Sequence, residues 1–138
     1  MNREELRKEL IRDEGLRLKL YKCTAGKWTL GVGHNIEDNP ITERAAMAIL
    51  DDDISTVEAG LDRMFPWWRN LSEVRQRVMC NWAFQLGITR LLGFSKALQA
   101  IQEGRWEDAE THMLDSRWSV QTPARARRLA SLMRSGGA

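Results

Sequence analysis

The sequence is poor in the features that mark several large classes of protein. Its 138 residues include two cysteines, Cys23 and Cys80, which are too few for a disulfide framework or a cysteine-based metal site. No stretch approaches the roughly 18 uninterrupted apolar residues of a membrane-spanning helix, and residues 1–10 lack the apolar segment of a signal peptide. We therefore expect no membrane span, and accumulation in the cytoplasm of the cell that makes the protein.

The chain also lacks a strong net charge. Its 21 Lys and Arg residues against 19 Asp and Glu residues give +2, which indicates no particular partner. The distribution is uneven, because the segment from Ser116 to Ala138 contains no acid and five arginines, Arg117, Arg125, Arg127, Arg128 and Arg134. A basic segment favours contact with an anionic polymer such as cell wall or nucleic acid. A solvated helix face explains it equally well.

The first part of the chain changes periodicity twice. Residues 2–15 predict a helix that Asn2 can cap and Gly15 can end. Residues 17–33 alternate between apolar and polar side chains, which is typical of strands. From Thr42 a long helix is predicted that stops at Phe65–Pro66. The sequence therefore predicts a small mixed lobe followed by a connecting helix.

The remainder is predicted to be helical. Cap and stop residues mark four segments: Ser72 to Gly87, Ser95 to about Gly104, Trp106 to Leu114, and a last helix opening at Thr122–Pro123. The fold class is α+β and mostly helical, a single domain with a small lobe at about 1–42, a connecting helix at about 43–65 and a helical lobe at about 66–138. Two lobes joined by one helix predict a cleft between them.

The alternating segment predicts a hairpin with two different faces. Residues 24–26 suit a three-residue turn with Gly26 in the left-handed conformation. This register places Leu20 opposite Leu30 and Leu18 opposite Val32 on an apolar face that should pack against the core. The other face collects Arg17, Lys19, Tyr21, Cys23, Lys27, Thr29, Gly31 and Gly33. The two glycines either leave room for a bulky ligand or mark a bulge or a tight packing position.

Glu14 occupies the last turn of the first predicted helix. The helix carbonyls there present the negative end of the dipole, which disfavours the ionised carboxylate. A general acid needs its protonated form to be favoured in this way. The ordinary alternative is an exposed surface glutamate.

Several motifs occur in one order along nearly the whole chain. Glu14 is followed after eight residues by Cys23, and Cys23 after five residues by Thr29, with Gly31-Val32-Gly33-His34 next. Further matches are Phe84–Gly87, Gly93-Phe94, Arg105-Trp106, Ser116–Trp118 and Gln121–Pro123. With these motifs the sequence closely resembles the phage-type lysozymes, or endolysins.

The resemblance implies a lysozyme-like fold and hydrolysis of the β-1,4 bond between N-acetylmuramic acid and N-acetylglucosamine in peptidoglycan, which lyses the host wall. It implies that Glu14 is the proton donor, that Thr29 holds the attacking water, and that Cys23 is the second catalytic position. The implied substrate contacts are Tyr21, Gly33, Asn35, Phe84, Gln85 and Arg117. No cofactor or metal is expected.

The resemblance also implies a setting for the enzyme. A monomer would stay in the host cytoplasm until a separate holin opens the membrane and releases it to the periplasm or wall. His34 resembles a structural histidine, and Asp53 is its expected partner. The chain departs from the family by lacking a segment between the hairpin and the connecting helix, and by carrying Ala97 and His112 at positions of substrate contact.

Cys23 stands where the best-known family members carry an aspartate, so two mechanisms remain. Thr29 and Cys23 can position a water for single displacement with inversion, or Cys23 can attack and form a thioglycoside with retention. We favour the first, because a thioglycoside hydrolyses slowly. The competing functions are a glycan-binding module without catalysis and a small nucleic-acid-binding protein, the latter disfavoured by the weak net charge.

Overall fold

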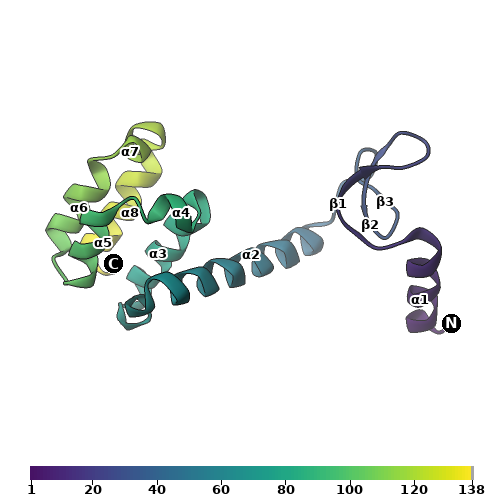
Figure 1. The fold of residues 1–138 in the computed structure, drawn as a ribbon, viewed down its shortest axis with the longest axis horizontal. Coiled ribbons are helices and arrows are strands. Elements are labelled where there is room, and N and C mark those ends of the chain that lie inside the picture. The colour runs from purple at the N-terminus through teal and green to yellow at the C-terminus, as the bar shows by residue number, and fades with distance from the viewer. Residues whose placement is uncertain (138) are drawn as a thin grey trace. The chain divides into compact units, whose positions relative to one another are not determined.

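A computed structural model describes residues 1–137, which divide into two compact units. The first unit is Met1–Ala48 and the second begins at Ile49, so the boundary falls inside the long helix α2 (Figure 1). In chain order the elements are α1 Arg3–Glu14, β1 Arg17–Lys22, β2 Trp28–Gly31, β3 His34–Asn35, α2 Glu43–Met64, the 3₁₀ helix η1 Pro66–Asn70, α3 Glu73–Leu86, α4 Ile88–Leu91, α5 Ser95–Gln102, α6 Trp106–Leu114, α7 Arg117–Gln121 and α8 Pro123–Ser135. The mostly helical α+β class is confirmed.

Helix α1 begins and ends at the predicted residues. The Asn2 side chain accepts a hydrogen bond of 3.0 Å from the Glu5 backbone N–H, which satisfies one of the free donors of the first turn. At the other end Gly15 has a φ of +79°, and its N–H donates to the Ile11 carbonyl at 2.8 Å. Glu14 is therefore the last residue of the helix.

Three antiparallel strands follow in the order β1-β2-β3. Tyr21 pairs with Thr29 and Lys22 with Trp28, and Gly26 has a φ of +77°, so the predicted three-residue turn is confirmed. Arg17, however, pairs with Gly31, because the register shifts between Arg17 and Tyr21. The predicted pairing of Leu18 with Val32 is wrong for this reason.

The apolar face of the hairpin has no core beneath it within the first unit. Leu18 is 91% exposed and Leu20 is 59% exposed, so this face packs against no core inside the first unit, and its packing against the helical unit stays a prediction. Helix α1 contributes no buried residue. Among residues 1–48 the one buried side chain is the polar Thr29. Hydrogen bonds and turn geometry, rather than apolar packing, therefore define the local structure of this unit.

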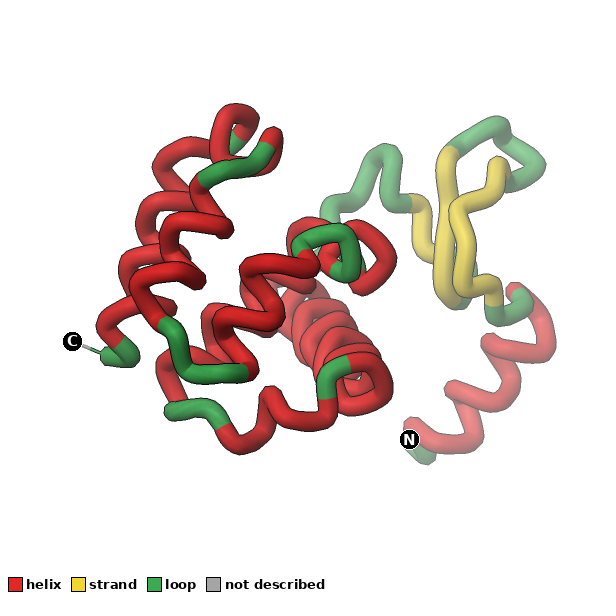
Figure 2. The backbone as a smooth tube through the Cα atoms, turned by 60° about the vertical axis from the view of Figure 1, so that its left-hand side comes forward, coloured by secondary structure: helices red, strands yellow, loops and turns green. Residues whose placement is uncertain are grey.

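The second unit contains the hydrophobic core. Figure 2 shows helices and short loops here, whereas the strands all belong to the first unit. Apolar residues three or four positions apart on α3, α5, α6 and α8 face inward, as the periodicity predicts. Trp82 lies at the centre, with its ring 4.9 Å from Phe94 and 5.4 Å from Trp118 between centroids. The largest fully buried side chains are Trp68, Trp82, Leu61, Met79, Leu91, Ile101, Met113, Met133 and Val78.

The helices of this unit start at the predicted positions, but some of the predicted N-cap hydrogen bonds are not made. Ser72 caps α3 by accepting from the Arg75 N–H at 3.3 Å, as predicted. Ser95 is instead the first residue of α5, and Phe94 before it makes no side-chain cap. Thr122 precedes α8, but its hydroxyl donates back to the Trp118 carbonyl at 3.1 Å, so it does not cap that helix. The short elements η1, α4 and α7 were not predicted.

None of the helices in residues 1–137 combines the length and the hydropathy that crossing a membrane requires. These residues hold no group of three or more His, Cys, Asp or Glu side chains arranged to bind a metal ion.

Candidate active site

Glu14 reaches from the end of α1 to the tight turn between β2 and β3. A Cβ atom placed on Gly33 would lie 2.9 Å from Glu14 Oε2 and 3.2 Å from Glu14 Cδ. Gly33 also has a φ of +64°, where a side chain is strained. The bare backbone of Gly33 therefore makes room for the Glu14 carboxyl. Contact of Gly33 with a substrate stays a prediction, and Gly31 is open, with nothing within 4 Å of a Cβ placed there.

Cys23 lies at the hairpin tip, in a turn closed by main-chain hydrogen bonds. Its N–H donates to the Lys27 carbonyl at 2.9 Å, and its own carbonyl accepts from the Gly26 N–H at 2.8 Å. The thiol is half-buried. Hydrogen bonding from the Lys27 backbone lowers the pKa of the Cys23 thiol, with a smaller contribution from the Ala25 backbone. The turn therefore favours the thiolate more than an ordinary exposed cysteine does.

Thr29 lies on β2 directly behind this turn. Its hydroxyl donates to the Lys27 carbonyl at 2.9 Å, so its oxygen lone pairs stay free to accept a hydrogen bond. The residue is 2% exposed, whereas the sequence predicts it on a polar face of the hairpin. The Thr29 side chain lies within hydrogen-bonding reach of the Cys23 thiol, and their joint role in the site stays a prediction.

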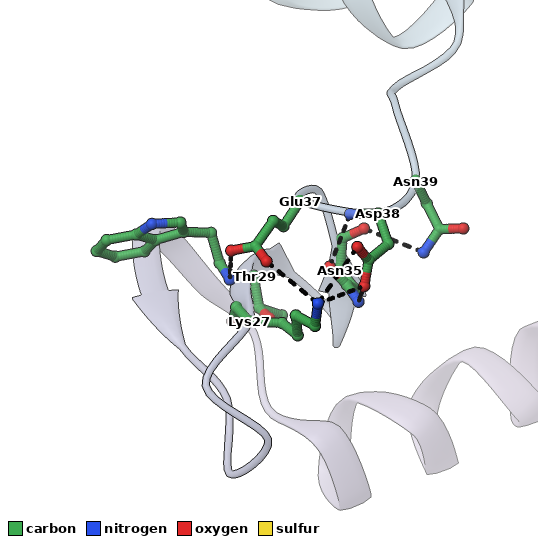
Figure 3. Close-up of polar contacts among 7 residues, drawn as sticks. Lys27, Thr29, Asn35, Glu37, Asp38 and Asn39 are labelled. Carbon is green, nitrogen blue, oxygen red and sulfur yellow. Dashed lines mark hydrogen bonds and ion pairs between the residues drawn. The ribbon is translucent and has the colours of Figure 1, made fainter.

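Asn35 and the loop after β3 form a polar network beside the hairpin tip (Figure 3). The Asn35 amide donates to Asp38 Oδ2 at 2.9 Å, and Asn35 Oδ1 accepts from the Asp38 N–H at 3.1 Å. Both ends of this side chain are thus used within the turn. The Lys27 ammonium lies 3.3 Å from Glu37 Oε2 and 3.4 Å from Asp38 Oδ2. We did not predict this network, and the only signal in the sequence was the acidic pair after Asn35.

Two other predicted residues of the first unit have identified neighbours. Tyr21 is half-buried, with the Arg17 guanidinium carbon 4.4 Å from its ring centroid, a cation–π geometry. His34 Nε2 lies 2.9 Å from the Asn39 carbonyl oxygen, which gives this histidine a structural partner in its own unit. Its pairing with Asp53 stays a prediction.

The predicted substrate-contact residues of the second unit differ in exposure and in the hydrogen bonds that they already make. Phe84 is 45% exposed and lines a cavity of about 570 Å³ together with Leu50, Ile54, Val57, Trp68 and Cys80. Gln85 is half-buried and its Oε1 accepts from the Trp118 indole N–H at 2.9 Å, which ties it to the core. Arg117 is exposed at the start of α7.

A second cavity of the same unit, of about 400 Å³, contains the two substituted contact positions. Ala97 and His112 line it with Phe94, Asp115 and Ser116. The two positions that the resemblance assigned to substrate contact thus share one cavity wall.

Comparison with known proteins decides the family. The profile of the family described as Phage lysozyme matches residues 12–135. The chain belongs to the phage lysozyme family. It therefore belongs to a family of glycoside hydrolases, and the matched range includes all the residues that we assigned to the site.

The chain is similar to proteins of phages and of Dictyostelium discoideum. The chain is 28% identical over 153 residues to "Probable T4-type lysozyme 1" of Dictyostelium discoideum, with 90% of each chain covered. It is 37% identical over 112 residues to "Endolysin" of Acyrthosiphon pisum secondary endosymbiont phage 1, covering 78% of this chain and 73% of the relative. It also matches "Pre-baseplate central spike protein Gp5" of Enterobacteria phage T4, at 30% identity over 155 residues, 92% of this chain and 27% of the relative.

Proposed function

We propose that this lysozyme-family protein is an endolysin that cleaves the β-1,4 bond between N-acetylmuramic acid and N-acetylglucosamine in peptidoglycan. Glu14 acts as the general acid, and Thr29 and Cys23 position the attacking water. The observation that carries the proposal is that one unit, residues 1–48, holds the carboxyl of Glu14 over Gly33 and the Cys23 thiol beside the Thr29 hydroxyl.

The position of Glu14 supports its role as the acid. Its carboxyl lies against the Gly33 backbone at the end of α1, at the tight turn that joins β2 to β3. Protonated Glu14 donates its proton to the glycosidic oxygen while the bond from that oxygen to the anomeric carbon breaks. The leaving sugar departs with a hydroxyl, and the anomeric carbon takes up positive charge.

The hairpin tip supports activation of water. Thr29 keeps oxygen lone pairs free because its hydrogen is donated to the Lys27 carbonyl, so it can accept from a water. The backbone hydrogen bonds that lower the pKa of Cys23 increase its thiolate fraction, and a thiolate can accept the other proton of that water. The water oxygen then attacks the anomeric carbon from the face opposite the leaving group. The product has inverted configuration.

The same thiolate supports the alternative of direct attack. Cys23 sulfur would then bond to the anomeric carbon, and a water would later hydrolyse the thioglycoside with net retention. Single displacement is preferred because a thioglycoside hydrolyses slowly and because Thr29 is suited to binding water.

Further parts of the proposal come from the family likeness. Tyr21, Gly33, Asn35, Phe84, Gln85 and Arg117 are assigned to substrate contact. A separate holin would give the enzyme access to the wall from the host cytoplasm. Expression in a bacterium with and without a membrane-permeabilising protein, followed by cell fractionation and turbidity, tests this arrangement.

Product analysis tests the central activity. Purified peptidoglycan is digested, the new reducing ends are reduced with borohydride, and the amino sugars are identified. A muramidase yields reduced N-acetylmuramic acid, and the Glu14→Gln variant yields none. New reducing ends on N-acetylglucosamine, or cleavage of the peptide, would contradict the proposal. Binding to peptidoglycan without any cleavage by the wild type would establish the glycan-binding module instead.

A further inference from the structure

One carbonyl oxygen at the hairpin tip serves both side chains assigned to water activation. The Lys27 carbonyl accepts the Cys23 N–H at 2.9 Å and the Thr29 hydroxyl at 2.9 Å. A rotation of the peptide between Lys27 and Trp28 would therefore disturb the main chain of Cys23 and the side chain of Thr29 together. The position of this peptide controls how the two groups lie relative to each other.

The side chain of the same lysine is held by two carboxylates. Lys27 Nζ lies 3.3 Å from Glu37 Oε2 and 3.4 Å from Asp38 Oδ2, on the loop that follows β3 (Figure 3). The hydrogen bond with Glu37 is the first cause of a raised pKa of Lys27, so the ammonium stays charged. Ion pairs therefore connect the hairpin tip to the loop that follows β3.

The two carboxylates are themselves fixed to the sheet. The Glu37 N–H donates to the Trp28 carbonyl at 3.2 Å, and Glu37 Oε1 accepts from the Trp28 N–H at 3.4 Å. Asp38 is held by both ends of the Asn35 side chain. Lys27 therefore pairs with groups that β2 and β3 hold in place, and this unit has no apolar core that could replace the attachment.

We propose that Lys27 is a positioning residue: its ion pairs with Glu37 and Asp38 hold the hairpin tip in the conformation that places Cys23 and Thr29 for water activation. This inference rests on the proposed function. We name the Lys27, Glu37 and Asp38 contacts the tip clamp. Because the three side chains are partly exposed, each pair stabilises modestly, and we expect its loss to lower kcat by roughly three- to tenfold.

Kinetics of two Lys27 variants test the clamp. Lys27→Met removes the ammonium but keeps most of the aliphatic chain, and Lys27→Arg keeps the charge and can pair with both carboxylates. We expect Lys27→Met to lower kcat with little change in KM, and Lys27→Arg to recover most of the loss. The matched control is Lys8→Met, which removes an exposed ion pair with Glu5 on α1 in the same unit and should leave kcat unchanged.

A second measurement separates positioning from simple charge effects. The double variant Glu37→Gln, Asp38→Asn removes two negative charges near the tip, and electrostatics alone would then lower the pKa of Cys23. Release of the clamp instead weakens the backbone hydrogen bonds to sulfur and raises that pKa. The titratable and charged groups on β1, the hairpin turn, β3 and the loop after it are Arg17, Lys19, Tyr21, Lys22, Lys27, His34, Glu37 and Asp38, with Glu14 at the end of α1. The rate of iodoacetamide alkylation of Cys23 is followed from pH 6 to 10 in a Cys80→Ser background.

Slower alkylation at neutral pH in the double variant, with its midpoint moved to higher pH, supports the clamp. A midpoint that is unchanged or moved to lower pH would overturn it, as would an equal kcat for Lys27→Met and the wild type. Alkylation needs no catalysis, so the two proposals are separable. An inactive wild type with the expected alkylation shift removes the muramidase and keeps the clamp as a structural device. An active wild type without the alkylation shift keeps the muramidase and removes the clamp.

Discussion

The two units of this chain are stabilised in different ways. The second unit packs tryptophans, leucines and methionines into one hydrophobic core, and its helices are placed by that packing. In the first unit the one buried side chain is Thr29, and α1 and the sheet are defined by a cap, glycine turns, main-chain pairing and the tip clamp. The proposed chemistry therefore lies in the unit where single polar contacts and backbone conformations matter most.

The two cysteines show the same contrast on a smaller scale. Backbone hydrogen bonds in a tight turn lower the pKa of Cys23, whereas burial beside the core raises the pKa of Cys80, with Glu58 adding to the rise. The two environments therefore shift the thiol pKa in opposite directions, toward the thiolate at Cys23 and toward the neutral thiol at Cys80.

The largest expected effect is the loss of hydrolysis in Glu14→Gln. The substitution keeps the shape of the side chain over Gly33 and removes the transferable proton, so the rate should fall by about 10³-fold. Urea unfolding should remain as in the wild type, because the side chain is exposed. Reducing-end release from peptidoglycan measures the rate, and a variant with substantial remaining activity would remove Glu14 from its role.

The next effect is one of stability and is confined to the second unit. Leu91 is fully buried, so Leu91→Ala leaves a cavity and should lower the free energy of unfolding by about 2–5 kcal/mol. The matched control in the first unit is Leu18→Ala, where the side chain is 91% exposed and little should change. Equal losses in urea denaturation would contradict the contrast between the units.

The third effect compares two glycines of the first unit. Gly31 and Gly33 have φ values of +68° and +64°, so alanine at either position brings similar backbone strain of about 1–2 kcal/mol. Only Gly33→Ala places a Cβ against the Glu14 carboxyl, and displacement of that group should lower kcat by about 10²-fold. Gly31→Ala should lower the free energy of unfolding by about as much as Gly33→Ala does, but should keep most of the wild-type kcat. Equal kcat values would show that Gly33 does not position Glu14.

The smallest effect is a difference in thiol reactivity. With Cys80→Ser and Cys23→Ser variants, each thiol can be alkylated separately at pH 7.5. Cys23 should react roughly tenfold faster or more, because its lowered pKa gives more thiolate while burial keeps Cys80 protonated. Faster labelling of Cys80 would reverse the assignment of the two environments.

Local signals in the sequence predicted much of this structure. Asn2 and Gly15 bound α1, Gly26 sets the hairpin turn, and the spacing of apolar residues defines the long helix and the core helices. The shift in register between Arg17 and Tyr21 was not predicted, because nothing local to those residues marks a bulge. The elements α4 and α7 are too short for periodicity to reveal.

For the candidate site, the motif identified the residues and missed the contacts that hold them. The spacing of Glu14, Cys23 and Thr29 is readable in the sequence, but the fit of Glu14 over Gly33 depends on where α1 ends relative to the turn after β2. The burial of Thr29 and the tip clamp depend on the loop after β3 folding back to β2. These contacts join residues whose pairing no local pattern encodes.

The central claim is that Thr29 and Cys23 hold a water that attacks the anomeric carbon from the face opposite the leaving group, which Glu14 protonates. The anomeric configuration of the first product tests this claim most directly. Proton NMR of a defined muropeptide, recorded before mutarotation, reports the configuration at the newly formed reducing end. Attack by water in a single displacement yields the α-anomer first, inverted from the β-linked substrate. An initial β-anomer would contradict the claim and identify Cys23 as a nucleophile.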